Sequence, residues 1–358
     1  MNSLKISFVI PAFNVASTIN RCFESIYTLP LDESEFEVII IDDCSTDNTV
    51  DLIQQYIENH ANIVLLCQPE NHRQGAARNR GISVAKGVFV VFVDSDDETS
   101  KGVVDAINMA DENDLDMVAM RFSKIGCDGK TEKEVSLPYD SKKVFSGIEM
   151  QTEFPFWSTA SWSYIYRKAF IDHVNYPFVE DVLYEDSDFV NIHLHKAKRM
   201  SYSDECGYII HNNVNSTTQT ISYKHICDYA LLGIRMLRFF DGLDDKTSPY
   251  SEKILEGGSY NIMTALRKLL ELKSRSEVRD FYDRFDSHYD RKLLMGYRKP
   301  AYCWNWWTRF CLKHRRIIIV IMGCTIPIVK MIKKNKMKKL TIIAGARQNF
   351  MKITLITK

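Results

Sequence analysis

One stretch of the chain joins a fully apolar run to four acids within five positions: Val88-Phe89-Val90-Val91-Phe92-Val93-Asp94-Ser95-Asp96-Asp97-Glu98. The apolar half predicts a buried strand, and the acids follow its carboxyl end. Carboxylates so close together repel one another unless a cation compensates. Mg²⁺ and Mn²⁺ prefer carboxylate oxygens, usually one or two of them together with phosphate oxygens and water. Alternation sends Asp94 and Asp96 to one side of an extended segment, so the stretch predicts a site for a metal and a nucleotide.

Other runs rich in Val, Ile and Phe predict the sheet to which this strand belongs. The further strand candidates are Ile6–Ile10, Phe36–Ile41, Ile63–Leu66 and Met117–Phe122. Segments of helical period lie between the strands, at 18–27, 46–58, 75–85 and 101–112. This alternation predicts the α/β class, with an open, mostly parallel twisted sheet and flanking helices. Ligands bind such sheets beyond the carboxyl ends of the strands.

Polar residues at the other strand ends are candidates for the same site. Pro11 and Asn14 follow the first strand, where a dinucleotide-binding domain would carry a Gly-rich turn, and they either shape a turn or line a ligand. Asp43 follows the second strand, where it either accepts a hydrogen bond from a nucleobase or caps the next helix. Arg78 precedes the apolar run and either contacts the nucleotide or pairs with acids of neighbouring loops.

A second acidic group, Glu185, Asp186 and Asp188, stands at a predicted helix start. Helix N-termini stabilise acids, which explains at least one of them, and a carboxylate here also suits a general base. Around this group we predict helices starting in 157–170 and 187–195, loops and a small added element over about 123–160, and short strands at 200–202 and 208–211. His211 is either a diphosphate contact or a loop histidine.

The charge of the chain is unevenly distributed, although 46 Lys plus Arg balance 46 Asp plus Glu over its 358 residues. Residues 298–358 hold 15 of the basic residues and no acid, which leaves 31 basic and 46 acidic residues before them. The acidic body excludes a nucleic-acid-binding domain, which needs a basic surface. The nine cysteines form no Cys-x-x-Cys pair, as expected for reduced thiols in the cytoplasm.

The segment 298–358 differs from the rest of the chain and predicts contact with a membrane surface. An aromatic cluster, Trp304, Trp306, Trp307 and Phe310, precedes the 13-residue run Ile317–Val329. This run is shorter than the roughly 20 residues that cross a bilayer. Lysines follow the run. Aromatics, a short apolar run and unbalanced lysines favour peripheral attachment to anionic lipid over a helix packed on the body. We therefore divide the chain into an α/β domain (1–220), a helical appendage (221–297) and this tail.

Five collinear motifs resemble those of the inverting family 2 glycosyltransferases of the GT-A fold, of the kind that build bacterial surface polysaccharides. They are Val9-Ile10-Pro11-Ala12-Phe13-Asn14, Ile41-Asp42-Asp43-x-Ser45, Ala77-Arg78-Asn79-x-Gly81, Val93-Asp94-x-Asp96-Asp97 and Glu185-Asp186. The resemblance runs from residue 6 to about residue 218. Where the family commonly carries an Arg-rich stretch before a Ser, this chain has residues 211–216, His-Asn-Asn-Val-Asn-Ser.

The resemblance implies a role for each matching residue. Asp186 matches the catalytic base, with Glu185 and Trp162 on the acceptor side. Asp94 and Asp96 match the Asp-x-Asp that holds the ribose and a divalent metal, Mn²⁺ or Mg²⁺, and Asp97 is a second candidate for the metal. Asp43 matches the acid that binds the nucleobase, usually uracil. Pro11, Asn14 and Arg78 match the other positions that line the nucleotide-sugar pocket.

The implied reaction is direct displacement with inversion, in which Asp186 takes a proton from an acceptor hydroxyl as it attacks the anomeric carbon of a nucleotide-sugar. A glycan or lipid-linked acceptor at the inner face of the cell membrane fits the basic tail. One alternative is a sugar nucleotidyltransferase, which would carry a Gly-rich, Arg-containing loop where residues 11–14 stand. The other is a non-catalytic glycan-binding or scaffold protein, which would not need the acids at 94–97 and 186.

Overall fold

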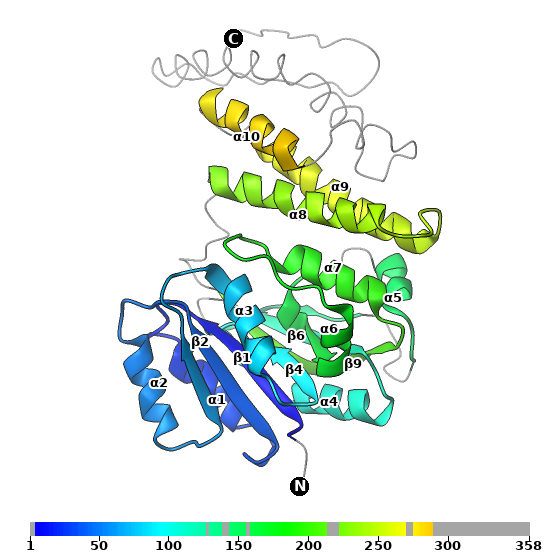
Figure 1. Cartoon of the computed structure of the whole chain (residues 1–358). Coiled ribbons are helices and arrows are strands. Elements are labelled where there is room, and N and C mark those ends of the chain that lie inside the picture. Colours follow the sequence, from blue (N-terminus) through cyan, green and yellow to red (C-terminus); the bar gives the residue numbers. More distant parts are fainter. Residues whose placement is uncertain are drawn as a thin grey trace, which may run out of the picture.

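A computed structural model of the chain describes residues 4–126, 129–137, 143–154, 158–212, 222–269 and 275–288. These residues form an α/β body with three long helices stacked on one end of it (Figure 1). None of the described helices is both long enough and apolar enough to cross a membrane. The tail 298–358, with its predicted membrane contact, lies outside the described residues.

The body is built on one sheet whose first part is parallel. Here the strands run in the order β3-β2-β1-β4: β1 (Ile6–Ala12), β2 (Phe36–Asp42), β3 (Ile63–Cys67) and β4 (Phe89–Phe92). The register aligns Ala12 with Asp42 and Val9 with Phe92. The chain therefore leaves β1, β2 and β4 at the same edge of the sheet, which is where the predicted site residues follow.

The second part of the sheet is mixed. It continues from β4 as β8-β6-β9-β5, with β7 paired to β6: β5 (Glu98–Thr99), β6 (Met117–Ile125), β7 (Thr131–Val135), β8 (Tyr164–Arg167) and β9 (Met200–His211). The strand β8 is antiparallel to both β4 and β6, whereas β6 and β9 are parallel. Because β5 pairs with β9, the acidic loop after β4 is joined directly to this half of the sheet.

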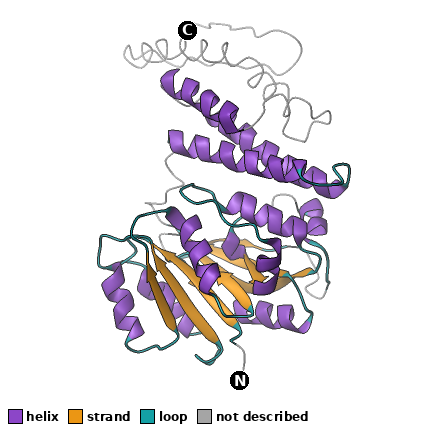
Figure 2. Ribbon diagram, in the orientation of Figure 1, coloured by secondary structure: helices purple, strands orange, loops and turns teal. Residues whose placement is uncertain are grey.

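Helices cover both faces of the sheet (Figure 2). Their bounds are α1 (Ile19–Tyr27), α2 (Thr49–Ile57), α3 (Arg73–Val84), α4 (Gly102–Glu112), α5 (Gly147–Glu153), α6 (Lys168–Val174) and α7 (Asp186–Lys196). Within β1, Phe8 and Ile10 belong to the core under α1 and α4, whereas Val9 belongs to the core under α3 and α7. Two covered faces explain why the strands are almost continuously apolar.

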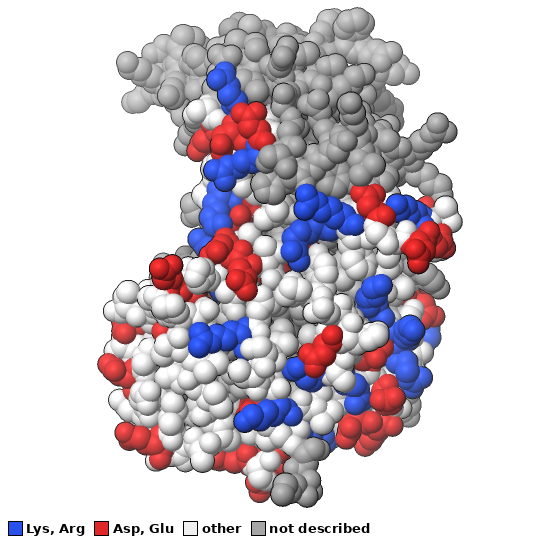
Figure 3. Space-filling view, viewed as in Figure 1, with Lys and Arg blue, Asp and Glu red and all other residues white. Residues whose placement is uncertain are grey.

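Three further helices form the appendage: α8 (Tyr223–Asp241), α9 (Pro249–Leu269) and α10 (Arg275–His288). They share a separate apolar core, which Ile192 of α7 joins. Figure 1 shows α7 lying between the body and α8. On the face in Figure 3, acidic and basic side chains are interspersed over the described surface.

The structure confirms the predicted α/β class but corrects several elements. A helix does start in 157–170, but only at Lys168, where α6 begins, because Ser161–Ser163 is a 3₁₀ turn and β8 follows it. Tyr164 and Tyr166 pack into one core and Ile165 into the other, so the strand shows no polar alternation. The two short strands at 200–202 and 208–211 are one strand, β9, whose register with β6 shifts at Arg121. Within 123–160, where loops and a small added element are predicted, the described residues form two elements, β7 and α5, as well as loops.

We expect Gly81→Ala to destabilise the protein by about 1–3 kcal/mol, a typical result of overpacking a core. A Cβ at this position in α3 would lie 2.3 Å from Val9 Cγ1 and 3.0 Å from Ile41 Cδ1. Val9 is fully buried and β-branched, so its side chain has little freedom to move away. The measurement is urea unfolding, with Ser83→Ala on the exposed side of the same helix as the control. Equal midpoints for the two variants would contradict this packing.

Candidate active site

The predicted site residues gather at the edge of the sheet where β1, β2 and β4 end. Asp94 follows β4, Arg78 lies in α3, and Asp186 is the first residue of α7, with Glu185 just before it. These four residues come from three separate segments of the chain. The topology brings them together because α3 and α7 pack on the same face of the sheet.

The Arg78 guanidinium is the centre of this arrangement and is only 1% exposed. Its Nη2 donates to Asp94 Oδ1 at 2.8 Å, and its Nη1 donates to Asp186 Oδ1 at 3.2 Å and also to Glu185 Oε1. Of the two alternatives for Arg78, the structure shows the pairing with neighbouring acids. One cation thus links the acidic loop after β4 to the first turn of α7.

Burial and the shared cation set the ionisation of this cluster. Burial raises the pKa of Glu185 to about 7, although the Arg78 charge opposes the shift. Burial also raises the pKa of Asp186, and the Asp94 charge adds to the shift whereas the Arg78 charge opposes it. For Arg78 itself burial lowers the pKa, but Asp186, Asp94 and Glu185 together outweigh it and keep the guanidinium charged. The site therefore holds a carboxylate of increased basicity beside a permanent cation.

The acidic loop after β4 is anchored to β9 through Asp97. Tyr208 Oη donates to Asp97 Oδ2 at 3.1 Å, and the His211 backbone N–H donates to Asp97 Oδ1 at 2.8 Å. Tyr208 Oη also accepts a bond from the Asp94 backbone N–H at 3.0 Å. Burial and the charges of Asp94 and Asp96 raise the pKa of Asp97 to about 8. Both Asp97 oxygens are thus engaged by protein donors.

The neighbours of Asp97 differ in exposure and contacts. Asp96 is half-buried, and its backbone carbonyl accepts a bond from Arg21. The His211 ring, a predicted diphosphate contact, is paired through Nε2 with Glu98 Oε1 at 2.5 Å. Trp162 stacks on Tyr208 with 4.5 Å between the ring centroids and 11° between the planes. Trp162 therefore supports the acidic loop indirectly, by packing on Tyr208, which binds Asp97.

The loops after β1 and β2 form a second, adjoining part of the site. Asp43 is buried, and its Oδ1 accepts bonds from Gln68 Nε2 at 2.7 Å and from the His72 backbone N–H at 2.8 Å. It does not cap α2, where Asp47 instead accepts from the Thr49 N–H. Asn14 has a φ of 53° and accepts a bond from the Thr46 N–H at 2.8 Å, which ties the two loops together. Pro11 lies within β1, just before these loops.

Some residues of the site were not foreseen from the sequence. Tyr208 and Arg21 bind the acidic loop, and Gln68 fixes Asp43, yet none of the three is part of a motif. Tyr208 lies in a predicted strand. Its phenol hydroxyl, a polar group in an otherwise apolar segment, is the one feature that could indicate a role. Arg21 is a single basic residue on an amphipathic helix, a pattern that gives no such signal.

The chain is similar to known proteins in both sequence and structure. The family model of Glycosyl transferase family 2 matches residues 7–174. The glycosyltransferase YibD of Escherichia coli is 32% identical over 71% of this chain and 75% of its own length. EpsJ of Bacillus subtilis is 31% identical over 62% of this chain and 65% of its own length. A poly(ribitol-phosphate) β-glucosyltransferase of Bacillus spizizenii is 34% identical over 40% of this chain, but this covers only 24% of that enzyme.

Solved structures share the fold. The crystal structure of Staphylococcus aureus TarS 1–349 with UDP-GlcNAc aligns with a TM-score of 0.60 and 21% identity over 95% of both chains. The same protein with UDP aligns with a TM-score of 0.63. This likeness confirms the GT-A fold that the motifs predicted.

Replacing the central cation should destabilise the protein strongly. We expect Arg78→Met to lower the free energy of unfolding by about 3–5 kcal/mol near neutral pH, because three carboxylates lose a shared buried partner. The loss should shrink as the pH falls and the carboxylates become protonated. Urea unfolding at several pH values measures both effects, with the more exposed Arg80→Met on the same helix as control. A loss equal to that of the control would contradict the central role of Arg78.

Glu185 should make stability depend on pH in a defined direction. Its pKa in the folded protein is raised from 4.5 to about 7, so folding favours the protonated form. Its contribution is therefore greatest below its unfolded pKa and is lost as the pH rises to about 7. We expect Glu185→Gln to flatten the stability profile in this window, with a residual slope from Asp186. Thermal unfolding across the window measures this, and an unchanged slope would contradict the assignment.

Proposed function

The chain belongs to glycosyl transferase family 2, and from this premise we propose that it transfers a sugar, with inversion, from a UDP-sugar to a hydroxyl of a glycan or lipid-linked acceptor. The observation that carries the proposal is the Arg78 cluster. It joins Asp94, on the expected donor side, to Asp186, the proposed base, through one buried guanidinium. The carboxylate proposed for the donor and the carboxylate proposed as the base would thus be held together by one guanidinium.

Asp186 is the proposed general base. As the acceptor oxygen forms its bond to the anomeric carbon, the bond to the diphosphate oxygen breaks and its electron pair leaves with the nucleoside diphosphate. The hydroxyl proton passes to the Asp186 carboxylate. A pKa raised by burial brings this carboxylate closer to the ideal for a base near neutral pH, and Arg78 orients it. Glu185 and Trp162 remain proposals for the acceptor side.

The donor would lie along the edge of the sheet between Asp43 and Asp94. Asp43 is held by Gln68 and the His72 N–H, an arrangement that fixes a carboxylate for a nucleobase imide. Pro11 and Asn14 would line the same pocket, and Asp94 would face the ribose. TarS, which shares the fold, was solved with UDP and with UDP-GlcNAc, and this supports uridine as the base.

A divalent metal fits Asp96 better than Asp97. Within the described ranges, no three His, Cys, Asp or Glu residues form a metal site. Asp97 already accepts protein hydrogen bonds on both oxygens, whereas Asp96 is half-buried and offers a hard oxygen donor. One carboxylate completed by diphosphate oxygens and water is a common environment for Mg²⁺, and Mn²⁺ accepts similar ligands. When bound, the metal would stabilise charge on the leaving diphosphate. A mannosyltransferase of related fold was solved with GDP-Man and Mn²⁺.

The relatives also indicate the kind of acceptor. Several are named for poly(ribitol-phosphate) or teichoic acid synthesis, so we propose a bacterial surface polymer or its lipid-linked precursor. Residues 298–358 would hold the enzyme at the anionic inner face of the cell membrane. Family membership leaves little support for the nucleotidyltransferase alternative. A non-catalytic binding protein is distinguished by the activity tests that follow.

Asp186→Asn should abolish most transfer while donor binding persists. We expect the rate to fall by about 10²–10⁴-fold, the usual contribution of a general base. The assay is transfer to a polymer acceptor from a panel of UDP- and GDP-sugars, with UDP affinity measured by calorimetry. Asp172→Asn, an exposed carboxylate of α6, is the control. Undiminished transfer by Asp186→Asn would remove Asp186 as the base.

Asp96→Asn should weaken the response to metal. Wild-type protein is expected to gain thermal stability from UDP with Mn²⁺ beyond that from UDP alone, because a ligand that binds only the folded state stabilises it. In Asp96→Asn the additional gain from Mn²⁺ should be lost, whereas in the control Asp105→Asn, a residue of α4, it should remain. A full Mn²⁺ response in Asp96→Asn would contradict the metal assignment.

A further inference from the structure

The segment between α6 and α7, residues 175–185, delivers Glu185 and Asp186 to the site through an unusual backbone. Asn175, Asp181 and Tyr184 have positive φ angles of 49°, 60° and 64°. Residues other than glycine seldom adopt this conformation, and it persists where surrounding contacts fix it. The contacts that fix this segment therefore decide where the first turn of α7 lies.

One set of contacts comes from α3. The Asn79 side chain pairs with the backbone of Phe178, donating to its O at 3.0 Å and accepting from its N at 2.9 Å. Gly75 lets the segment approach closely, since a Cβ there would lie 2.2 Å from Val179 O. These contacts hold the first half of the segment against the body.

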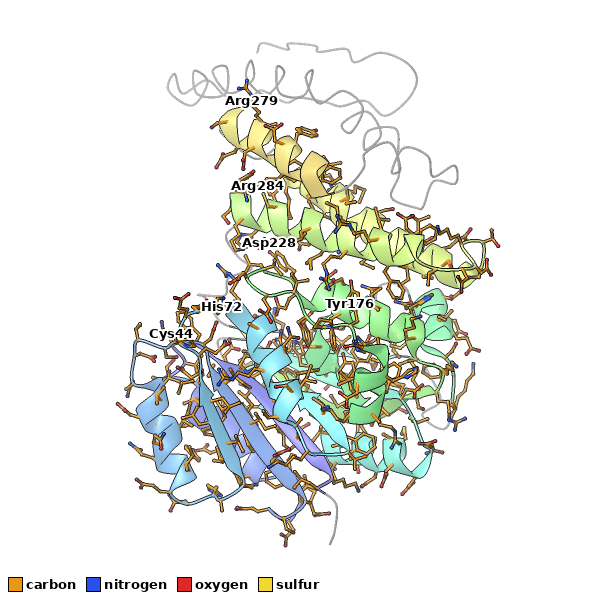
Figure 4. The ribbon with its side chains drawn as sticks, viewed as in Figure 1. Cys44, His72, Tyr176, Asp228, Arg279 and Arg284 are labelled. Atoms are coloured by element: carbon orange, nitrogen blue, oxygen red, sulfur yellow. The ribbon has the colours of Figure 1, made fainter. Side chains whose placement is uncertain are left out.

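The second half is held by Asp228 of α8. Asp228 is 5% exposed, and its Oδ2 accepts a bond from the Leu183 backbone N–H at 2.9 Å. Lys224, one turn earlier, contacts Asp228 Oδ1 at 3.3 Å and also donates to the Asp181 carbonyl. The Tyr184 ring stacks on Tyr229 with centroids 4.3 Å apart. Figure 4 shows Asp228 on the part of α8 near the α/β body, with His72 at the start of α3 below it.

Arg235, further along α8, holds the first turn of α7 itself. Its Nε donates to Asp188 Oδ2 at 2.6 Å, and its Nη2 donates to Pro177 O at 3.3 Å. The guanidinium also lies over the ring of Tyr176, at 4.8 Å, and Tyr176 Oη donates to Asp188 Oδ2 at 3.0 Å. Asp188 is fully buried, so an ionised carboxylate there depends on this cation. Burial raises the pKa of Asp188, and Arg235 opposes the shift.

We propose that α8 positions the catalytic base, with Asp228 and Arg235 as the positioning residues. Asp186 lies between their two points of attachment, Leu183 on one side and Asp188 on the other. Neither residue has a contact with Arg78 or Asp94 among those described above, so they act through the backbone that carries the base. The inference rests on the proposed role of Asp186. Displacement of a catalytic group by about 1 Å lowers a rate by roughly 10²-fold.

The test separates turnover from binding. In Asp228→Ala and Arg235→Met we expect kcat for transfer to fall by about 10- to 100-fold, with the KM for the donor and the affinity for UDP within about twofold of wild type. Asp228→Asn keeps an acceptor for the Leu183 N–H and should recover most of kcat. The exposed residues Asp244 and Arg267 provide the matched controls Asp244→Ala and Arg267→Met.

Lys224→Met keeps the test decisive if a buried variant does not fold. Lys224 is 41% exposed at its side chain and braces Asp228 from the surface, so its loss should lower kcat by a few-fold at unchanged KM. Wild-type kcat in every folded variant, or a raised donor KM at unchanged kcat, would overturn the inference. If Asp186→Asn were fully active, the proposed base would fail instead, and the two failures are thus distinguishable.

Discussion

The arrangement of the site depends on one buried guanidinium shared by three carboxylates. Like charges repel strongly in a medium of low dielectric constant, so Asp94, Glu185 and Asp186 can lie together only because Arg78 is among them. The sheet makes this possible by ending β4 beside α3 and by packing α7 on the same face. The same ion that stabilises the fold at this point therefore also fixes the geometry of the proposed site.

Around this centre, each functional loop is fixed by an element from elsewhere in the chain. The acidic loop is fastened to β9 by Tyr208, Asp43 is fastened to the loop after β3 by Gln68, and the segment before α7 lies between α3 and α8. Such supports are what a transferase needs, since a site of this kind tolerates little displacement of its reacting groups. The charges of the site are thus held in place before a substrate arrives.

Much of the fold and the location of the site could be predicted from the sequence because local patterns encode them. Continuous apolar strands that end in acids marked the sheet edge, and Asp94, Arg78 and Asp186 do lie together there. The strand β8 was missed because a short strand buried on both faces has no periodicity that separates it from a helix. Asp188 and Arg235 are 47 positions apart, and pairings at that separation leave no local pattern to find.

The position of α7 between the body and α8 has a consequence for the design of fragments and chimeras of these enzymes. A fragment ending near residue 220 would retain every motif of the family, yet it would lack Arg235, the partner of the Asp188 carboxylate, and Asp228, the partner of the Leu183 N–H. The α/β unit therefore takes part of the support for its α7 segment from α8. A chimera that exchanges the helical part between relatives would therefore need to keep both partners of each of these contacts.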